Sequence, residues 1–303
     1  MSISSYSQEA GWPTLLRFGF VFEYLDLLSN NFSGSIPKGI GKLPRLQVLN
    51  LCCNLLNETI PTFLGNLSSL EQLLLAYNYL FAPGVIPPQL GYLSKLQNLW
   101  VPKCNLVGEI PDSIGNLAAL RNLDLSWNQL SGTIPESITK LNQVTQIELY
   151  HNNLSGRIPE NWSNLSSLRS FDASTNMLNG TIPKKLEKLP LSSLSLFENN
   201  LEGNILEAIG YSPNLFELKL FSNNLTSSLP GNLGNFSGLQ TLDIAGNQLS
   251  GTLPSDICKK GKLQTLNVFN NNFFGQVPLK YGACLSLERV RMHNNKLTGQ
   301  IPS

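Results

Sequence analysis

The sequence predicts an α/β-type repeat solenoid, with a parallel β-sheet along its concave face and 3₁₀ or irregular segments along its convex face. Three observations predict this fold. A unit with the pattern Leu-x-x-Leu-x-Leu-x-x-Asn-x-Leu-x-Gly-x-Ile-Pro recurs along the chain, its spacing is nearly constant, and each unit joins a short alternating segment to a turn signal. Because such units bury their apolar faces only against their neighbours, all 303 residues can form one elongated array.

One asparagine position, here called the slot, marks each repeat. Successive slots are 24 residues apart, except for 26 residues between Asn78 and Cys104 and 23 between Asn176 and Asn199. The sequence therefore predicts twelve repeats, with these slot residues: Asn30, Asn54, Asn78, Cys104, Asn128, Asn152, Asn176, Asn199, Asn223, Asn247, Asn271 and Asn295.

The pattern within a repeat has a physical explanation. The alternating Leu-x-Leu segment predicts a short strand with its leucines inward, and stacked copies form a parallel sheet at about 4.8 Å spacing. The slot asparagine carries donors and an acceptor on a short side chain, so it can bond the backbone where the chain leaves the strand. The Gly-x-Ile-Pro element permits a tight turn and extends the residue before the proline, which argues against a long helix.

The two ends differ from the middle of the chain. Residues 1–23 form an atypical N-terminal segment without the paired cysteines of a proper cap, and residues 24–303 form the solenoid, which stops within a repeat. The first residues lack the basic and apolar regions of a secretory signal, and no segment reaches the ~20 apolar residues that span a bilayer. These features predict a fragment of a longer protein.

Composition excludes several classes of partner and chemistry. Charged residues make up 14% of the chain and the net charge is +1, which disfavours nucleic acid and anionic lipid. Five cysteines without a Cys-x-x-Cys pair give no sign of a zinc or redox site. Cys258 and Cys284 occupy nearly equivalent places in adjacent repeats, so a bridge between them is geometrically conceivable.

Catalytic motifs are missing from the sequence. It contains no nucleotide-binding loop, no zincin motif and none of the elements of a protein kinase. The two histidines, His151 and His293, lie six repeats or about 29 Å apart and cannot share a site. We expect no catalytic residue, no metal and no cofactor in this chain, which is therefore not expected to be an enzyme.

The concave face instead offers outward side chains suited to an extended ligand. Aromatic rings alternate with hydrogen-bonding groups there, as in many binding surfaces. Arg289 and Arg291 flank the inward Val290, so two guanidinium groups face the same way and can clamp a carboxylate; pairing with Glu288 or Glu217, or simple solvation, is the alternative. The other candidate contacts are Asp124, Trp127, Tyr150, Asp172, Phe197, Lys219, Phe221 and Asn267.

Nine Asn-x-Ser/Thr sequons suggest a secreted glycoprotein, although the repeat pattern itself generates some of them. They begin at Asn31, Asn57, Asn66, Asn153, Asn161, Asn164, Asn179, Asn224 and Asn235.

Longer stretches resemble one family. The strings LWVPKCNLVGEIPDSIGNL, QIELYHNNLSG, FDASTNMLNGTIP, LSLFENNLEG, ELKLFSNNL and SLERVRMHNNKLTGQIP are similar to the plant HAESA and HAESA-like leucine-rich-repeat receptor kinases, from about Leu25 to the end. The resemblance implies plant-specific leucine-rich repeats in the hormone-binding ectodomain of a serine/threonine receptor kinase. It includes the cysteine in the slot at position 104 and the shortened repeat near Pro190.

The resemblance also implies a ligand and partners. The ligand would be a short secreted hydroxyprolinated peptide hormone, with Arg289 and Arg291 capturing its terminal carboxylate and Glu148, Phe171 and Ser193 forming the pocket for its central hydroxyproline. A co-receptor kinase of the somatic-embryogenesis type would close over the bound peptide at the extracellular face of the plasma membrane. The pocket and the arginine pair lie four to five repeats apart, or roughly 19–24 Å, which five to seven extended residues can span.

Two other functions remain open at this stage. A secreted leucine-rich-repeat inhibitor of a pathogen cell-wall-degrading enzyme has a similar fold and length, but such inhibitors carry cysteine caps at both ends. A non-signalling decoy would follow from secretion of the fragment by itself.

Overall fold

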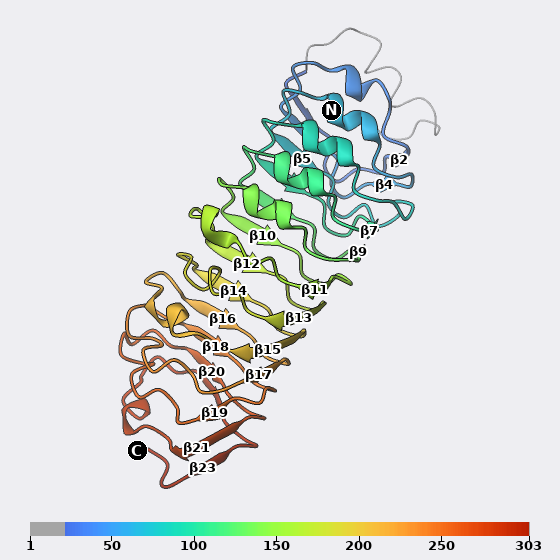
Figure 1. The fold of residues 1–303 in the computed structure, drawn as a ribbon. Coiled ribbons are helices and arrows are strands. Elements are labelled where there is room, and N and C mark those ends of the chain that lie inside the picture. The colour runs from blue at the N-terminus through green and yellow to red at the C-terminus, as the bar shows by residue number, and fades with distance from the viewer. Residues whose placement is uncertain (1–21, 303) are drawn as a thin grey trace.

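The computed structural model describes residues 22–302, and it forms an elongated, curved solenoid of stacked coils (Figure 1). One strand from each repeat joins a parallel sheet of twelve strands, with neighbours in chain order, so the predicted sheet is confirmed. Its strands are β1 (Tyr24–Asp26), β3 (Val48–Asn50), β5 (Gln72–Leu74), β6 (Asn98–Trp100), β8 (Asn122–Asp124), β10 (Gln146–Glu148), β12 (Ser170–Asp172), β14 (Ser193–Ser195), β16 (Glu217–Lys219), β18 (Thr241–Asp243), β20 (Thr265–Asn267) and β22 (Arg289–Arg291).

The register of this sheet places equivalent residues side by side. In β10, Ile147 lies between Leu123 and Phe171, and all three side chains are buried. One buried hydrophobic cluster extends from the first repeats to the last, as expected when each coil packs on its neighbours. The strands inside the sheet therefore turn one side chain into the core and two outward, the alternation that their sequence predicts, whereas in β22, the last described strand, the central Val290 is 47% exposed.

All helices within residues 22–302 are short 3₁₀ helices, in agreement with the prediction for the convex side. Those from η2 to η5 stack in register along the solenoid (Figure 1). The helices are η1 (Ile40–Lys42), η2 (Thr62–Asn66), η3 (Pro88–Tyr92), η4 (Asp112–Asn116), η5 (Glu136–Lys140), η6 (Trp162–Asn164), η7 (Glu207–Tyr211) and η8 (Leu279–Tyr281).

Segments expected to be irregular form additional short parallel strands. Coils of nearly equal length bring the segments after successive slots to hydrogen-bonding distance, so their backbone groups pair. Gly156 and Gly180 adopt positive φ of 72° and 73° within these strands, which only glycine does at little cost. The strands are β2 (Ser33–Gly34), β4 (Leu55–Leu56), β7 (Val107–Gly108), β9 (Gln129–Leu130), β11 (Ser155–Arg157), β13 (Met177–Thr181), β15 (Asn200–Asn204), β17 (Asn224–Thr226), β19 (Ser250–Gly251), β21 (Asn272–Gln276) and β23 (Lys296–Thr298).

The slot asparagines form the predicted ladder. Asn152 donates to the carbonyls of Leu125 and Leu149, both at 3.0 Å, and accepts from the Leu130 amide at 3.0 Å. Its side chain thus binds its own repeat and the preceding one. Cys104 fills its slot with a thiol whose Sγ lies 3.1 Å from the Leu75 carbonyl.

Two further expectations concern the ends. Cys258 and Cys284 form a disulfide between adjacent repeats. The N-terminal segment predicted over residues 1–23 lies outside the described residues, apart from its last two.

Candidate ligand-binding surface

From β8 to β22, two rows of outward side chains cross the concave sheet, one on each side of the central residue of each strand. The central residues are buried except for Val290 of β22, which is 47% exposed. The first row lies before the central residue and contains Asn122, Gln146, Ser170, Ser193, Glu217, Thr241, Thr265 and Arg289. The second row lies after it and contains Asp124, Glu148, Asp172, Ser195, Lys219, Asp243, Asn267 and Arg291. Both rows end on an arginine, and the second begins with three carboxylates.

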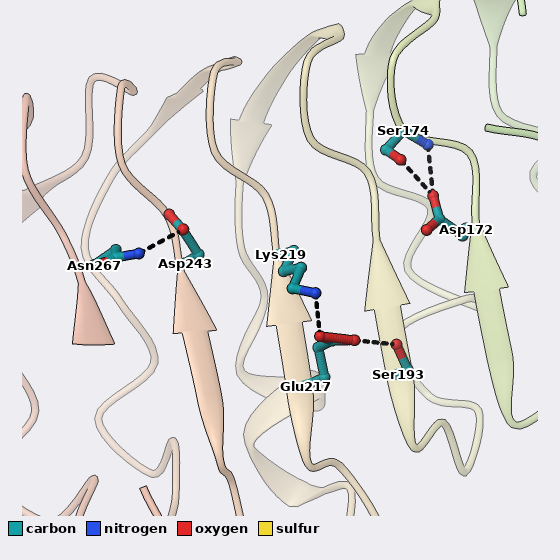
Figure 2. A network of polar contacts seen from close by, with 7 residues as sticks. All are labelled: Asp172, Ser174, Ser193, Glu217, Lys219, Asp243 and Asn267. Carbon is teal, nitrogen blue, oxygen red and sulfur yellow. Dashed lines mark hydrogen bonds and ion pairs between the residues drawn. The ribbon is translucent and has the colours of Figure 1, made fainter. Parts of the chain in front are cut away.

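Polar contacts hold several of these side chains in place (Figure 2). Glu217 forms an ion pair with Lys219 and accepts a hydrogen bond from Ser193 Oγ at 3.2 Å. Asn267 donates to Asp243 at 2.7 Å. The middle of the sheet therefore presents partnered charges.

The carboxylates at the start of the second row sit close together and partly out of water. Burial, with the neighbouring charges of Asp172 and Asp124, raises the pKa of Glu148 to about 7, although a hydrogen bond from Gln146 at 2.9 Å opposes the shift. Burial also raises the pKa of Asp172, whose Oδ1 accepts from the Ser174 hydroxyl and amide. Near neutral pH the Glu148 carboxyl can therefore donate or accept a proton in a hydrogen bond to a ligand hydroxyl.

The three residues proposed for the hydroxyproline pocket lie on the adjacent strands β10, β12 and β14. Glu148 and Ser193 are half-buried and face outward. Phe171 is 0% exposed, and its ring packs on Trp162 with 4.9 Å between centroids. Phe171 holds the central, inward position of β12, as its place in the repeat pattern predicts, and forms the floor beneath the outward groups. Its part in the pocket stays a prediction.

Arg289 and Arg291 project together from β22 and are both exposed. Within residues 22–302 the ion pairs are Lys219–Glu217 and Lys280–Asp256, so neither arginine is paired with a carboxylate. Their strand neighbours are Thr265 and Asn267.

The aromatic candidates lie just beyond the strand ends. Phe197 and Phe221 stack with 4.3 Å between ring centroids. Trp127 follows its strand at a positive φ of 54° and stacks on His151 at 3.8 Å, so it lies in the turn rather than on the sheet.

Sequence reasoning missed a feature of these turns. The residue before the slot adopts positive φ in every described repeat, and in several repeats its side chain contacts the equivalent one in the next repeat. For example, Lys103 Nζ lies 4.8 Å from the ring centroid of Trp127, the equivalent residue of the next repeat. The sequence could have indicated this column, because the residue before each slot occupies the same position in all twelve repeats.

Metal sites and membrane-spanning helices are not found in the described part of the chain. Within residues 22–302 no three metal-binding side chains converge, and no helix there is long and apolar enough to cross a bilayer.

Known proteins share both the repeat and its arrangement. A family model described as a leucine-rich repeat region matches residues 20–228, and a model of a single leucine-rich repeat matches residues 238–259. Receptor like protein 27 from Arabidopsis thaliana is 34% identical over 89 residues, which cover 29% of this chain and 11% of that protein.

Solved structures of plant receptors are similar over most of the chain. The Arabidopsis receptor kinase HAESA, solved with the peptide hormone IDA and the co-receptor SERK1, is 50% identical with a TM-score of 0.90, covering 92% of this chain and 47% of that one. The plant peptide hormone receptor RGFR1, solved with RGF2, is 37% identical with a TM-score of 0.86, covering 90% of this chain and 44% of that one.

This chain thus spans about half the length of the receptor structures that it matches. The matching family model covers more than half of the chain, and the twelve-stranded sheet is the one that this family of repeats builds. The chain belongs to the leucine-rich-repeat family, as a solenoid like the ectodomains of HAESA-type plant receptor kinases.

Proposed function

We propose that this chain is part of the ectodomain of a receptor kinase and binds a short secreted hydroxyprolinated peptide along its concave face. The observation that carries the proposal is the pair of exposed guanidinium groups of Arg289 and Arg291, unpaired within residues 22–302, at the end of two polar rows. A free carboxylate is the ligand that such a pair best accommodates, because two planar donor forks can bond it in parallel.

The distance between the two proposed contact points suits a peptide. Ser193 on β14 and Arg289 on β22 are four strands apart in the sheet, or about 19 Å. An extended segment of about six residues covers that distance. The solved HAESA and RGFR1 complexes, each with a peptide hormone, support the same class of ligand.

Each contact has a distinct role in the proposal. Glu148 and Ser193 bond the hydroxyl and backbone of the central hydroxyproline, and Phe171 supports them from the core. Further contacts come from Asp124, Asp172, Lys219 and Asn267 in the second row, and from Tyr150, Phe197 and Phe221 beyond the strand ends.

The whole protein would be a membrane-bound serine/threonine receptor kinase with this chain on the extracellular side. The HAESA structure contains the co-receptor SERK1, so a co-receptor kinase of that type is the proposed protein partner.

The test is calorimetric binding of a hydroxyprolinated abscission-type peptide to the chain and to Arg289→Ala, Arg291→Ala and the double variant. Losing one arm of a desolvated charge pair costs about 2–5 kcal/mol, so each single variant should raise Kd at least ~30-fold and the double variant should abolish detectable binding. A peptide with an amidated C-terminus should bind wild-type protein as weakly as the normal peptide binds the double variant.

Arg157→Ala is the matched control, because Arg157 is an exposed arginine of β11, outside the concave sheet. It should leave Kd unchanged. Equal binding by wild type and the double variant would contradict the carboxylate clamp, and no binding to any such peptide would contradict the proposed ligand class.

A further inference from the structure

A hollow of about 570 Å³ lies along one flank of the solenoid, in the turns that follow β6, β8 and β10. The hollow is shallow and largely open to solvent. We call it the flank groove, and the residues that define it here are Lys103, Asn105, Trp127, Gln129, His151 and Asn153.

One side of the flank groove is a continuous column of stacked groups. Lys103 approaches the Trp127 ring from the preceding repeat, at 4.8 Å, and His151 stacks on it from the following repeat, at 3.8 Å. Trp127 is nonetheless 46% exposed, so it presents mainly its ring edge to the groove. A ring edge carries partial positive charge and attracts oxygen atoms.

The residues one position after the slots bring amides to the groove. Gln129 donates to Asn105 Oδ1, and Asn105 donates to the Phe81 carbonyl at 2.9 Å. All ten residues that line the hollow lie in the described part of the chain; none is a carboxylate, and Lys103 is the sole lysine or arginine. Aromatic edges, neutral amides and one ammonium group suit an uncharged ligand rich in oxygen, which is the chemistry of a sugar.

Asn153, at the rim of the groove, is a candidate attachment site for such a sugar. It begins the sequon Asn153-Leu154-Ser155, its side chain is exposed and has no hydrogen bond within residues 22–302, and its backbone amide is fixed to the Leu130 carbonyl at 2.8 Å. The residue is thus held at the rim of the hollow with its side-chain nitrogen available for modification.

We propose that Asn153 carries an N-linked glycan and that the flank groove holds its first sugars. In the modification, Asn153 Nδ2 displaces the diphosphate of a lipid-linked oligosaccharide donor at the anomeric carbon. The C–N bond forms, the C–O bond to the diphosphate breaks, and the amide proton leaves with the diphosphate. Once attached, the sugar is at an effective concentration of the order of millimolar, so a groove of modest affinity stays filled.

The chain offers a matched comparison for this proposal. Asn224 begins another sequon and occupies the same place in its repeat, one residue after the slot, and it is also exposed. The residues before its own slot and the preceding one, which match His151 and Trp127, are Ser222 and Glu198, so no aromatic column of this kind adjoins it. A glycan on Asn224 is expected to extend into solvent.

The experiment uses the full chain expressed through a glycosylating secretory pathway, with glycan occupancy measured at both sites by peptide mapping. Under native conditions an endoglycosidase should release the Asn153 glycan at least ~10-fold more slowly than the Asn224 glycan. In Trp127→Ala the two rates should become similar. Asn153→Gln should lower Tm by about 2–4 °C, a shift that corresponds to roughly 1 kcal/mol, whereas Asn224→Gln should leave Tm unchanged.

Several results would overturn the proposal. One is an unmodified Asn153 in protein that carries a glycan at Asn224. Another is release of the two glycans from wild-type protein at equal rates. A third arm adds an N-acetylglucosamine disaccharide to Asn153→Gln protein at millimolar concentration. Saturable quenching at millimolar sugar is the expected result, because a groove of that affinity stays filled by a tethered glycan. Unchanged tryptophan emission would overturn the proposal, and saturation at micromolar sugar would assign the groove to a soluble oligosaccharide. Peptide binding plays no part in these measurements, so the proposed function stands or falls separately.

Discussion

Glu187 is a carboxyl group enclosed in the fold. It lies in the turn segment of the 23-residue repeat and is 1% exposed. Its Oε1 accepts a hydrogen bond from the Leu206 amide at 3.2 Å, while its Oε2 is buried without a partner in the described residues. Burial raises the pKa of Glu187 to about 7, because the ionised form would lose its hydration there.

This environment predicts a pH dependence of stability. The unfolded chain releases the Glu187 proton near the ordinary glutamate pKa of 4.5, whereas the folded chain keeps the proton until about pH 7. The free energy of unfolding should therefore fall by about 3 kcal/mol as pH rises from about 4.5 to about 7, and this contribution should be constant above that range. Denaturant unfolding of wild type and Glu187→Gln at several pH values measures it, and the variant should lose this part of the slope.

Glu202→Gln is the control for that measurement, because Glu202 is exposed on β15. It should keep the wild-type pH profile. A Glu187→Gln profile that parallels wild type would show that the buried carboxyl does not titrate in this range.

Within single elements, glycine is needed for two different reasons. The glycines after the slots turn the chain through positive φ, and the sequence pattern predicted their role. A second class lies in the 3₁₀ helices: a Cβ on Gly115 of η4 would lie 2.3 Å from the Ser137 carbonyl oxygen of η5. The stacked 3₁₀ helices therefore approach so closely that only glycine fits.

Gly115→Ala should be strongly destabilising, by about 2–4 kcal/mol, because the atom it would meet belongs to the backbone and cannot rotate away. Gly231→Ala is the matched control, since a Cβ there has no atom within 4 Å and φ is not positive. Thermal unfolding of both variants tests the prediction. Similar Tm values for the two variants would contradict the prediction and would mean that neighbouring coils can move apart at little cost.

At the scale of the whole molecule, a solenoid has only nearest-neighbour contacts, so damage near one end should remain local. The Cys258–Cys284 disulfide joins two adjacent repeats at the C-terminal end of the described chain, with a sequence separation of 26. Closing a loop of that length stabilises by about 3 kcal/mol in the chain-entropy account.

Replacing both cysteines by alanine should therefore expose the segment after residue 258 to proteolysis, at a rate raised roughly 100-fold. Cleavage before residue 200 should stay at the wild-type rate. Cys53→Ser is the control, because Cys53 is an exposed free thiol. Equal acceleration along the whole chain would instead indicate one cooperative unit.

Several features of the candidate site were decided by packing rather than by local pattern. Phe171 and Ile147 hold the same central place in neighbouring strands, and the contact of the buried Phe171 ring with Trp162 is set by packing. Trp127 lies in the turn because β8 ends at Asp124, and packing between coils decides that its ring stacks on His151 of the next repeat.

The sequence by itself determined the repeat length, the twelve-stranded parallel sheet, the asparagine ladder and the exposed arginine pair, because a fixed period repeats the same short-range hydrogen bonds and the same inward leucines. Only the tertiary structure decided which side chains meet across coils. The additional strands, the glycine contact between η4 and η5, the buried Glu187 carboxyl and the column along the flank groove all depend on how closely one coil approaches the next. That distance is set by packing between residues about 24 positions apart, which the pattern within one repeat does not contain.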